Sequence, residues 1–112
     1  MSGKPRVIKD FDKLDKHIKE QIKLTYPYGF SECLITFTDK DGHFISALPF
    51  ETDERYYMIK MSSSEAEQII EEDDDYNEKG TLKQSAKVSY QEKHADVNYM
   101  QNAFTDEEAK ED

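Results

Sequence analysis

The chain has 112 residues, of which 36% are charged and 36% hydrophobic, and its formal net charge is −10 at pH 7. This length suits one domain, and the acidic charge argues against direct binding to nucleic acid or anionic membranes, because phosphates are bound by an excess of Lys and Arg. The single cysteine, Cys33, excludes an internal disulfide, and the lack of an apolar leader or a long apolar run predicts a cytoplasmic protein without membrane contact.

Residues 1–9 are expected to form a flexible lead-in, and an amphipathic helix follows them. The apolar residues of its buried face recur at steps of three and four positions: Phe11, Leu14, Ile18 and Ile22. Asp10 suits the N-cap, because its carboxylate can accept a hydrogen bond from a free backbone amide. We expect the helix to end near Tyr26, since Pro27 disfavours a helical conformation in the residue before it.

Three segments typical of β-strands come next: residues 32–38 (ECLITFT), 43–50 (HFISALPF) and 55–61 (RYYMIKM). Their β-branched and aromatic residues favour extended structure, and apolar residues alternate along them. Pro49 predicts that the second strand ends there or lies at a sheet edge, because proline has no amide hydrogen for the ladder. Cys33 falls within the first strand, where we expect it to be buried.

The segment 39–42 (DKDG) joins the first two of these strands and resembles part of a calcium loop. If Gly42 took the sixth position of an EF-hand loop, Phe37 and Leu48 would take the first and twelfth, where oxygen ligands are needed. Asp at the start of a type I turn and Gly at its left-handed end account for the segment without a metal. The sequence therefore predicts a hairpin turn.

A capping box at residues 62–65 (SSSE) marks the start of a second helix, with Ala66, Ile69 and Ile70 on its apolar face. The acidic run EEDDD opposes the helix dipole, so we expect this helix to end by Asp74. After a loop at residues 77–80, residues 82–97 predict a third helix. Residues 101–112 are polar and acidic, which favours a disordered tail.

Residues 10–100 therefore predict a single α+β domain with the order α-β-β-β-α and a further helix. Sequential strands with short links favour a three-stranded antiparallel meander. One face of that meander is expected to pack on the helices, which gives two layers.

The sequence contains no recognisable catalytic or metal-binding motif. His17, His43 and His94 stand apart, and no pair has the H-x-x-x-H spacing that puts two imidazoles on one helical face. Phosphate-binding glycine loops and the hydrolase nucleophile elbow do not occur. The sequence predicts no catalytic residue, no metal ligand and no cofactor, although a spatial pairing of Cys33 with a histidine stays open.

Two groups of residues indicate contact with a partner. Tyrosines combine apolar area with a hydroxyl group and suit binding surfaces, while contiguous carboxylates attract basic surfaces. The candidate partner-binding residues are Tyr26, Tyr28, Tyr56, Tyr57, Glu71, Glu72, Asp73, Asp74 and Asp75. The competing interpretations are core packing for the tyrosines, and a solvated surface or weak binding of a divalent cation for the acids.

The strings PRVIKDFDKL (5–14), SALPFETDERYY (46–57) and EQIIEEDDDYNEKGTLK (67–83) resemble small acidic bacterial proteins to which no activity is assigned. The resemblance covers residues 4–100. It implies a bacterial cytoplasmic location and adds no site residue.

The leading hypothesis is a non-enzymatic interaction or regulatory module that docks a basic protein surface, such as an accessory of the transcription or translation machinery. The alternative is a small-molecule or metal-responsive domain with a pocket between sheet and helices, lined by Tyr26, Tyr56 and Tyr57. The sequence leaves the partner and the oligomeric state open.

Overall fold

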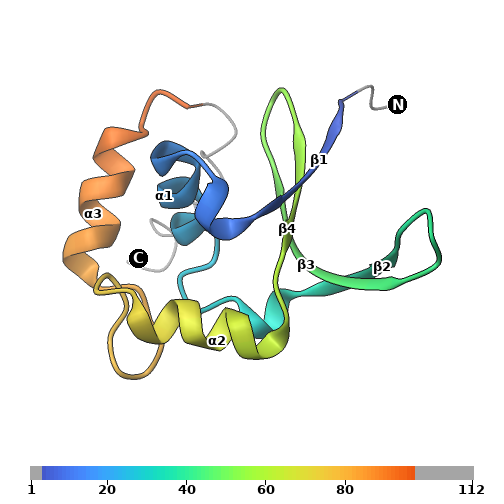
Figure 1. Cartoon of the computed structure of the whole chain (residues 1–112). Helices are drawn as coiled ribbons and strands as arrows, with labels where there is room; N and C mark the ends of the chain where they lie inside the picture. Colours follow the sequence, from blue (N-terminus) through green and yellow to red (C-terminus); the bar gives the residue numbers. More distant parts are fainter. Residues whose placement is uncertain (1–3, 98–112) are drawn as a thin grey trace.

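The computed structural model describes residues 4–97, which form a four-stranded sheet beside three α-helices (Figure 1). In chain order the elements are β1 (Arg6–Asp10), the 3₁₀ turn η1 (Phe11–Lys13), α1 (Lys16–Thr25), the 3₁₀ turn η2 (Ser31–Cys33), β2 (Ile35–Thr38), β3 (Phe44–Glu51), β4 (Tyr56–Lys60), α2 (Ser63–Glu72) and α3 (Gln84–Lys93). The predicted α+β class is confirmed. The predicted tail, residues 101–112, lies outside the described residues.

The sheet is mixed, which corrects the expected three-stranded antiparallel meander. Its order is β1-β4-β3-β2, with antiparallel β2–β3 and β3–β4 pairs and a parallel β1–β4 pair. β1 lies partly within residues 1–9, the expected flexible lead-in, so the element order begins with a strand. The sequence signal for β1 is weak because Val7 alone of its five residues is partly buried, and because Arg6 pairs with the distant Tyr56.

The first helix begins later than its apolar period suggests. Phe11 lies in η1, and Leu14 has an extended backbone with φ −81° and ψ 152°. Asp15, not Asp10, is therefore the residue that precedes α1. The apolar period predicted too early a start for the helix, because Phe11 and Leu14 both pack into the core as helical residues would, but from η1 and the residue after it.

The C-terminal end of α1 is confirmed at Tyr26. The Tyr26 amide donates to the Ile22 carbonyl at 2.9 Å, and Pro27 follows at once. Since Pro27 disfavours a helical conformation in the residue before it, the chain leaves the helix here and turns toward η2.

The predicted hairpin between β2 and β3 is confirmed. The Gly42 amide donates to the Asp39 carbonyl at 3.0 Å, and Gly42 has φ +85°, a conformation that glycine adopts readily. The Asp39 carboxylate accepts hydrogen bonds from the amides of Asp41 and His43, each at 2.9 Å. These bonds fix the turn.

Two details of the strands differ from expectation. β3 continues through Pro49 to Glu51, and it is an interior strand. Proline is tolerated there because β2 pairs no further than Ala47, and the Pro49 carbonyl accepts a hydrogen bond from the Tyr26 hydroxyl instead. Cys33 was expected to be buried in a strand, but it ends η2 and is exposed.

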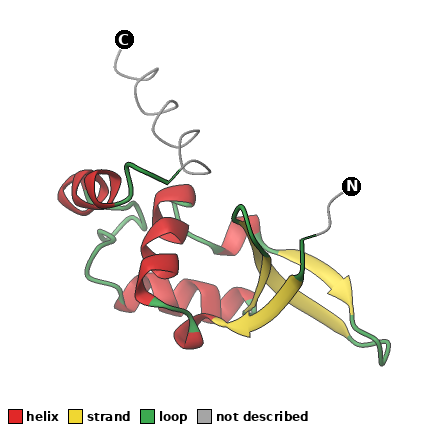
Figure 2. Cartoon of the chain, turned by 90° about the horizontal axis from the view of Figure 1, so that it is seen from above, coloured by secondary structure: helices red, strands yellow, loops and turns green. Residues whose placement is uncertain are grey.

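The helices gather on one side of the sheet, and the core lies between them and that sheet face (Figures 1 and 2). Leu48 and Ile59 stand opposite each other in β3 and β4 and are fully buried. They join one apolar cluster with Ile22 from α1 and Phe30 from the loop before η2. Removal of this apolar surface from water is the main force that holds the layers together.

The capping box of α2 is confirmed. The Ser62 hydroxyl accepts from the Glu65 amide at 3.1 Å, and the Glu65 carboxylate accepts from the Ser62 amide at 2.9 Å. Ala66 and Ile70 are buried in the core, and the helix ends at Glu72. The helix thus has a fixed start and an apolar attachment.

The third predicted helix is also confirmed, as α3, but it differs from α2 in its attachment. All ten residues of α3 are described and none of them is fully buried, although Ala86 and Tyr90 pack against the core from its edge. Polar contacts to α1 and to the loop after α2 must therefore contribute much of what holds it in place.

Candidate functional site

The nine predicted partner-binding residues lie in several places. Tyr26 and Tyr57 are half-buried and pack against the core, whereas Tyr56 is exposed along β4. Asp73 and Asp75 turn toward α1, and Glu72 accepts a hydrogen bond from Gln68.

One pair of the nine, Tyr28 and Glu71, lines a common groove of about 250 Å³ between α2 and the chain around η2. Tyr28 is 67% exposed. The exposed carboxylates of Glu67, Glu71 and Glu78 also line the groove, together with the single cation of Lys79. The groove therefore carries an excess of negative charge beside an accessible aromatic ring.

The buried part of the groove lining is apolar and comes from Phe30, Ala66 and Ile70. Apolar lining below charged edges suits a side chain with an apolar stem and a charged end. This arrangement matches the side chains of Lys and Arg.

Two loops are held together where they form one end of this groove. Gly29 and Gly80 both have positive φ, and a Cβ atom on Gly29 would lie 3.8 Å from the Gly80 carbonyl oxygen. The Leu82 amide donates to the Pro27 carbonyl at 2.7 Å, and the Tyr76 hydroxyl donates to the Tyr26 carbonyl at 3.0 Å. A Cβ at that distance would make an ordinary contact, so the two loops need glycine for its positive φ and not for the space between them.

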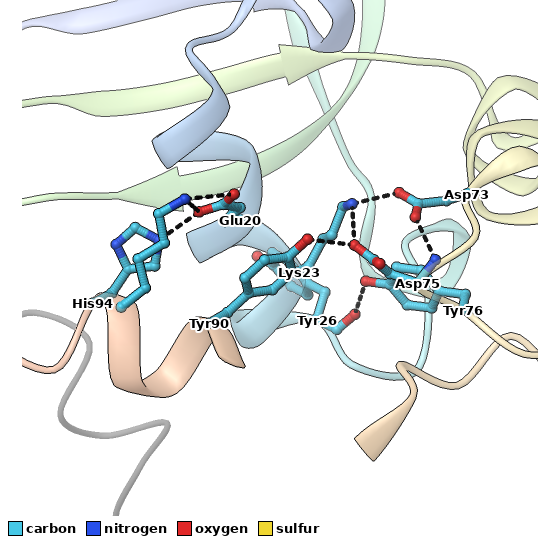
Figure 3. A network of polar contacts seen from close by, with 9 residues as sticks. Glu20, Lys23, Tyr26, Asp73, Asp75, Tyr76, Tyr90 and His94 are labelled. Carbon is cyan, nitrogen blue, oxygen red and sulfur yellow. Dashed lines mark hydrogen bonds and ion pairs between the residues drawn. The ribbon is translucent and has the colours of Figure 1, made fainter. Parts of the chain in front are cut away.

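A polar network lies between α1, α3 and the loop after α2 (Figure 3). Lys23 of α1 contacts Asp73 at 2.7 Å and Asp75 at 2.9 Å, and the Tyr90 hydroxyl of α3 donates to Asp75 at 2.6 Å. Two acids of the EEDDD run are therefore half-buried and share one lysine. Only part of that run faces solvent as predicted.

The charges of this network are stabilised by their partners. Burial alone would lower the pKa of Lys23, but hydrogen bonds with Asp73 and Asp75 outweigh burial and raise it. Burial would raise the pKa of Asp75, yet hydrogen bonds from Tyr90 and Lys23 hold it below its usual value. Lys23 and Asp75 are thus charged at neutral pH.

The tyrosines of the interior remain protonated. Burial raises the pKa of Tyr26 to about 12. Burial and the hydrogen bond to Asp75 also raise the pKa of Tyr90. These phenols act as hydrogen-bond donors and not as general bases.

A second part of the network joins α1 to the end of α3. His94 Nε2 lies 2.9 Å from Glu20 Oε1, and Lys93 Nζ donates to the two Glu20 oxygens at 3.0 and 3.1 Å. Gln21 Nε2 lies 3.4 Å from His94 Nδ1. This pattern fits an imidazole that donates from Nε2 to Glu20 and accepts at Nδ1 from the Gln21 amide.

Glu20 and His94 are both 4% exposed. Burial would raise the pKa of Glu20, but hydrogen bonds from His94 and Lys93 outweigh it, so this pKa lies below its usual value. Glu20 is thus a buried, ionised carboxylate held between two helices.

His17 stands beside this pair. The rings of His17 and His94 are 5.8 Å apart between centroids and nearly perpendicular. One ligand atom from each of His17, Glu20 and His94 can be chosen so that all three lie within 4.8 Å of one another. The sequence did not predict this cluster, because the H-x-x-x-H spacing describes two histidines on one helix and these two come from α1 and from the end of α3. The H-x-x-E spacing of His17 and Glu20 was the available signal.

Asp39, Asp41 and His43 form a second group of ligand atoms within the same distance. They lie in the β2–β3 turn, where the Asp39 carboxylate already accepts two backbone hydrogen bonds. Turn formation accounts for this group.

Among residues 4–97, no helix has the length and apolar character needed to cross a membrane. No protein-family model matches this chain, and neither a curated protein nor a solved structure matches it.

Proposed function

We propose that this chain is a non-enzymatic interaction module that docks a basic segment of a partner protein in the groove between α2 and η2. The observation that carries the proposal is that the exposed ring of Tyr28 and the carboxylates of Glu67, Glu71 and Glu78 line one groove with an apolar floor.

The chemistry of the groove favours an Arg or Lys side chain as its occupant. The methylene stem would lie on the apolar lining, and the charged end would reach the carboxylates. The face of Tyr28 would add a cation–π contact, usually worth about 0.5–1 kcal/mol at an exposed site. Arg is favoured over Lys because its planar group can bind a carboxylate with two hydrogen bonds.

The overall charge of −10 supports the same partner class, since it attracts basic surfaces over a distance. Machinery that handles nucleic acid is rich in such surfaces, and an accessory of transcription or translation is the partner class we propose. The tyrosine-pocket alternative has less support, because Tyr26 and Tyr57 pack against the core and the Tyr26 hydroxyl binds the Pro49 carbonyl.

The test uses the full chain and a short peptide with one Arg in a Gly/Ser background, followed by NMR of backbone amides at low salt. We expect shifts to concentrate at Tyr28, Ser31, Glu67, Glu71 and Glu78. A peptide with citrulline in place of Arg should lose most of the effect, and salt should weaken binding by screening.

The decisive variant is Glu67→Gln with Glu71→Gln, matched by Asp53→Asn with Glu54→Gln. Both pairs remove two exposed negative charges, but only the first pair lines the groove. We expect at least about tenfold weaker binding for the groove pair, equal to about 1.4 kcal/mol. Equal weakening by both pairs would show attraction by net charge alone and would refute the groove as the site.

A further inference from the structure

We propose that His17, Glu20 and His94 form a binding site for a divalent transition-metal ion of the Zn²⁺ type, which joins α1 to the end of α3. The proposal rests on the position of three ligand atoms within 4.8 Å of one another. It is independent of the groove between α2 and η2.

The two helices place these ligands for simple reasons. His17 and Glu20 are three residues apart in α1, so they lie on one face about one turn apart. His94 follows the last residue of α3 and turns inward to Glu20. The contact between the helices therefore presents two ligands from one helix and one from the other.

The donor set selects the class of ion. Two imidazole nitrogens and one carboxylate oxygen suit Zn²⁺ and its neighbours in the first transition row, whereas Ca²⁺ and Mg²⁺ prefer oxygen ligands. Three protein ligands leave a fourth tetrahedral position for water. His17 is exposed and provides the approach from solvent.

The groups around the ligands fit a metal site as well. A metal on His94 Nε2 places the imidazole proton on Nδ1, next to the buried side-chain amide of Gln21. If the Gln21 side-chain amide flips, its oxygen can accept a hydrogen bond from the Nδ1–H group of His94. Partners of this kind orient metal-bound histidines in many proteins.

Lys93 is the cation that a metal ion would have to displace from the Glu20 carboxylate. It donates to both Glu20 oxygens, and its side chain is 39% exposed, so it can move into solvent when a metal neutralises the carboxylate. Two ligand atoms on one tetrahedral Zn²⁺ lie about 3.4 Å apart. The 2.9 Å between His94 Nε2 and Glu20 Oε1 must therefore widen by about half an ångström on binding.

Metal binding should stabilise the attachment of α3 above all, because none of the ten residues of this helix is fully buried. A metal that links α3 to α1 would bind the folded chain more tightly than the unfolded chain. It would therefore raise the melting temperature of the protein as its concentration increases.

The experiment is a titration of the tag-free full chain with Zn²⁺ alone by calorimetry, with Co²⁺ absorption as a report on ligand geometry. We expect one ion per chain and a rise in melting temperature. His17→Ala should weaken binding by at least about tenfold, and because His17 is exposed this variant should fold normally, which circular dichroism will verify.

His43→Ala is the matched control, since it removes an exposed histidine from the other group of possible ligands. We expect this variant, and the groove pair Glu67→Gln with Glu71→Gln, to bind Zn²⁺ like the wild type. Unchanged affinity of His17→Ala, loss of binding in His43→Ala, or no stoichiometric binding by the wild type would overturn the proposal.

Discussion

α2 and α3 are each ten residues long, but they are attached to the domain in opposite ways. α2 begins with a complete capping box and buries Ala66 and Ile70. α3 lies at the edge of the core and is tied by Tyr90 to Asp75 and by His94 to Glu20. Apolar burial has no titrating group and no specific ion to lose, whereas a polar attachment depends on the charges of its side chains. One domain thus combines a helix held mainly by apolar burial with a helix held mainly by polar contacts.

The largest expected effect comes from the apolar attachment. Ile70→Ala should lower the free energy of unfolding by about 2–4 kcal/mol, because it removes buried methyl groups and leaves a cavity in the core. Val88→Ala on α3 should change it by less than about 0.5 kcal/mol, since Val88 is 41% exposed. Urea denaturation of both variants measures the difference. Similar losses in the two variants would contradict the comparison.

In metal-free buffer, Glu20→Ala should weaken the polar attachment of α3. This change leaves His94 and Lys93 without their carboxylate and should cost about 2–3 kcal/mol. Amide hydrogen exchange should accelerate in α3 more than in α2. The exposed Glu92 on α3 gives the control, and Glu92→Ala should leave exchange unchanged. Uniform acceleration across both helices would show that Glu20 supports the whole fold instead.

The smallest effect on the free energy of unfolding is expected from loss of the Asp75 charge, at low pH or by mutation. The pKa of Asp75 is lowered in the folded state from its usual 3.8, so its stabilisation is complete above about pH 4 and is lost as the pH falls through the folded value. Asp75→Asn should cost about 1 kcal/mol at pH 7 and should flatten this part of the acid dependence. Chemical denaturation between pH 2 and pH 7 is the measurement. The exposed neighbour Asp74 gives the control, and Asp74→Asn should change the free energy of unfolding at pH 7 by less than about 0.5 kcal/mol.

Local chemistry made much of the fold predictable. The capping box at Ser62, the end of α1 before Pro27 and the turn at Gly42 depend on residues close in sequence, and all three are confirmed. The parallel pairing of β1 with β4 was missed because it joins distant residues and buries little of β1. The late start of α1 was missed because an apolar period does not distinguish a helix from a turn that reaches the same core.

The candidate sites were less predictable for the same physical reason. Tyr28 and Glu71 were chosen from their chemistry, but the groove that contains both depends on how residues 28–31, α2 and residues 78–80 pack together. His17 and His94 come together through the packing of α1 on α3, which no spacing in the sequence describes. Residue type identified candidates, and tertiary contacts decided which of them lie together.

The position of Cys33 has a practical consequence. It is the single cysteine of the chain, and it is exposed at the end of η2, in the same short turn as the groove residue Ser31. A thiol-reactive dye would therefore attach at one known position without mutagenesis, and its fluorescence anisotropy would report peptide binding nearby. The same accessibility allows two chains to couple by air oxidation, so stocks of the protein should be kept with a reducing agent.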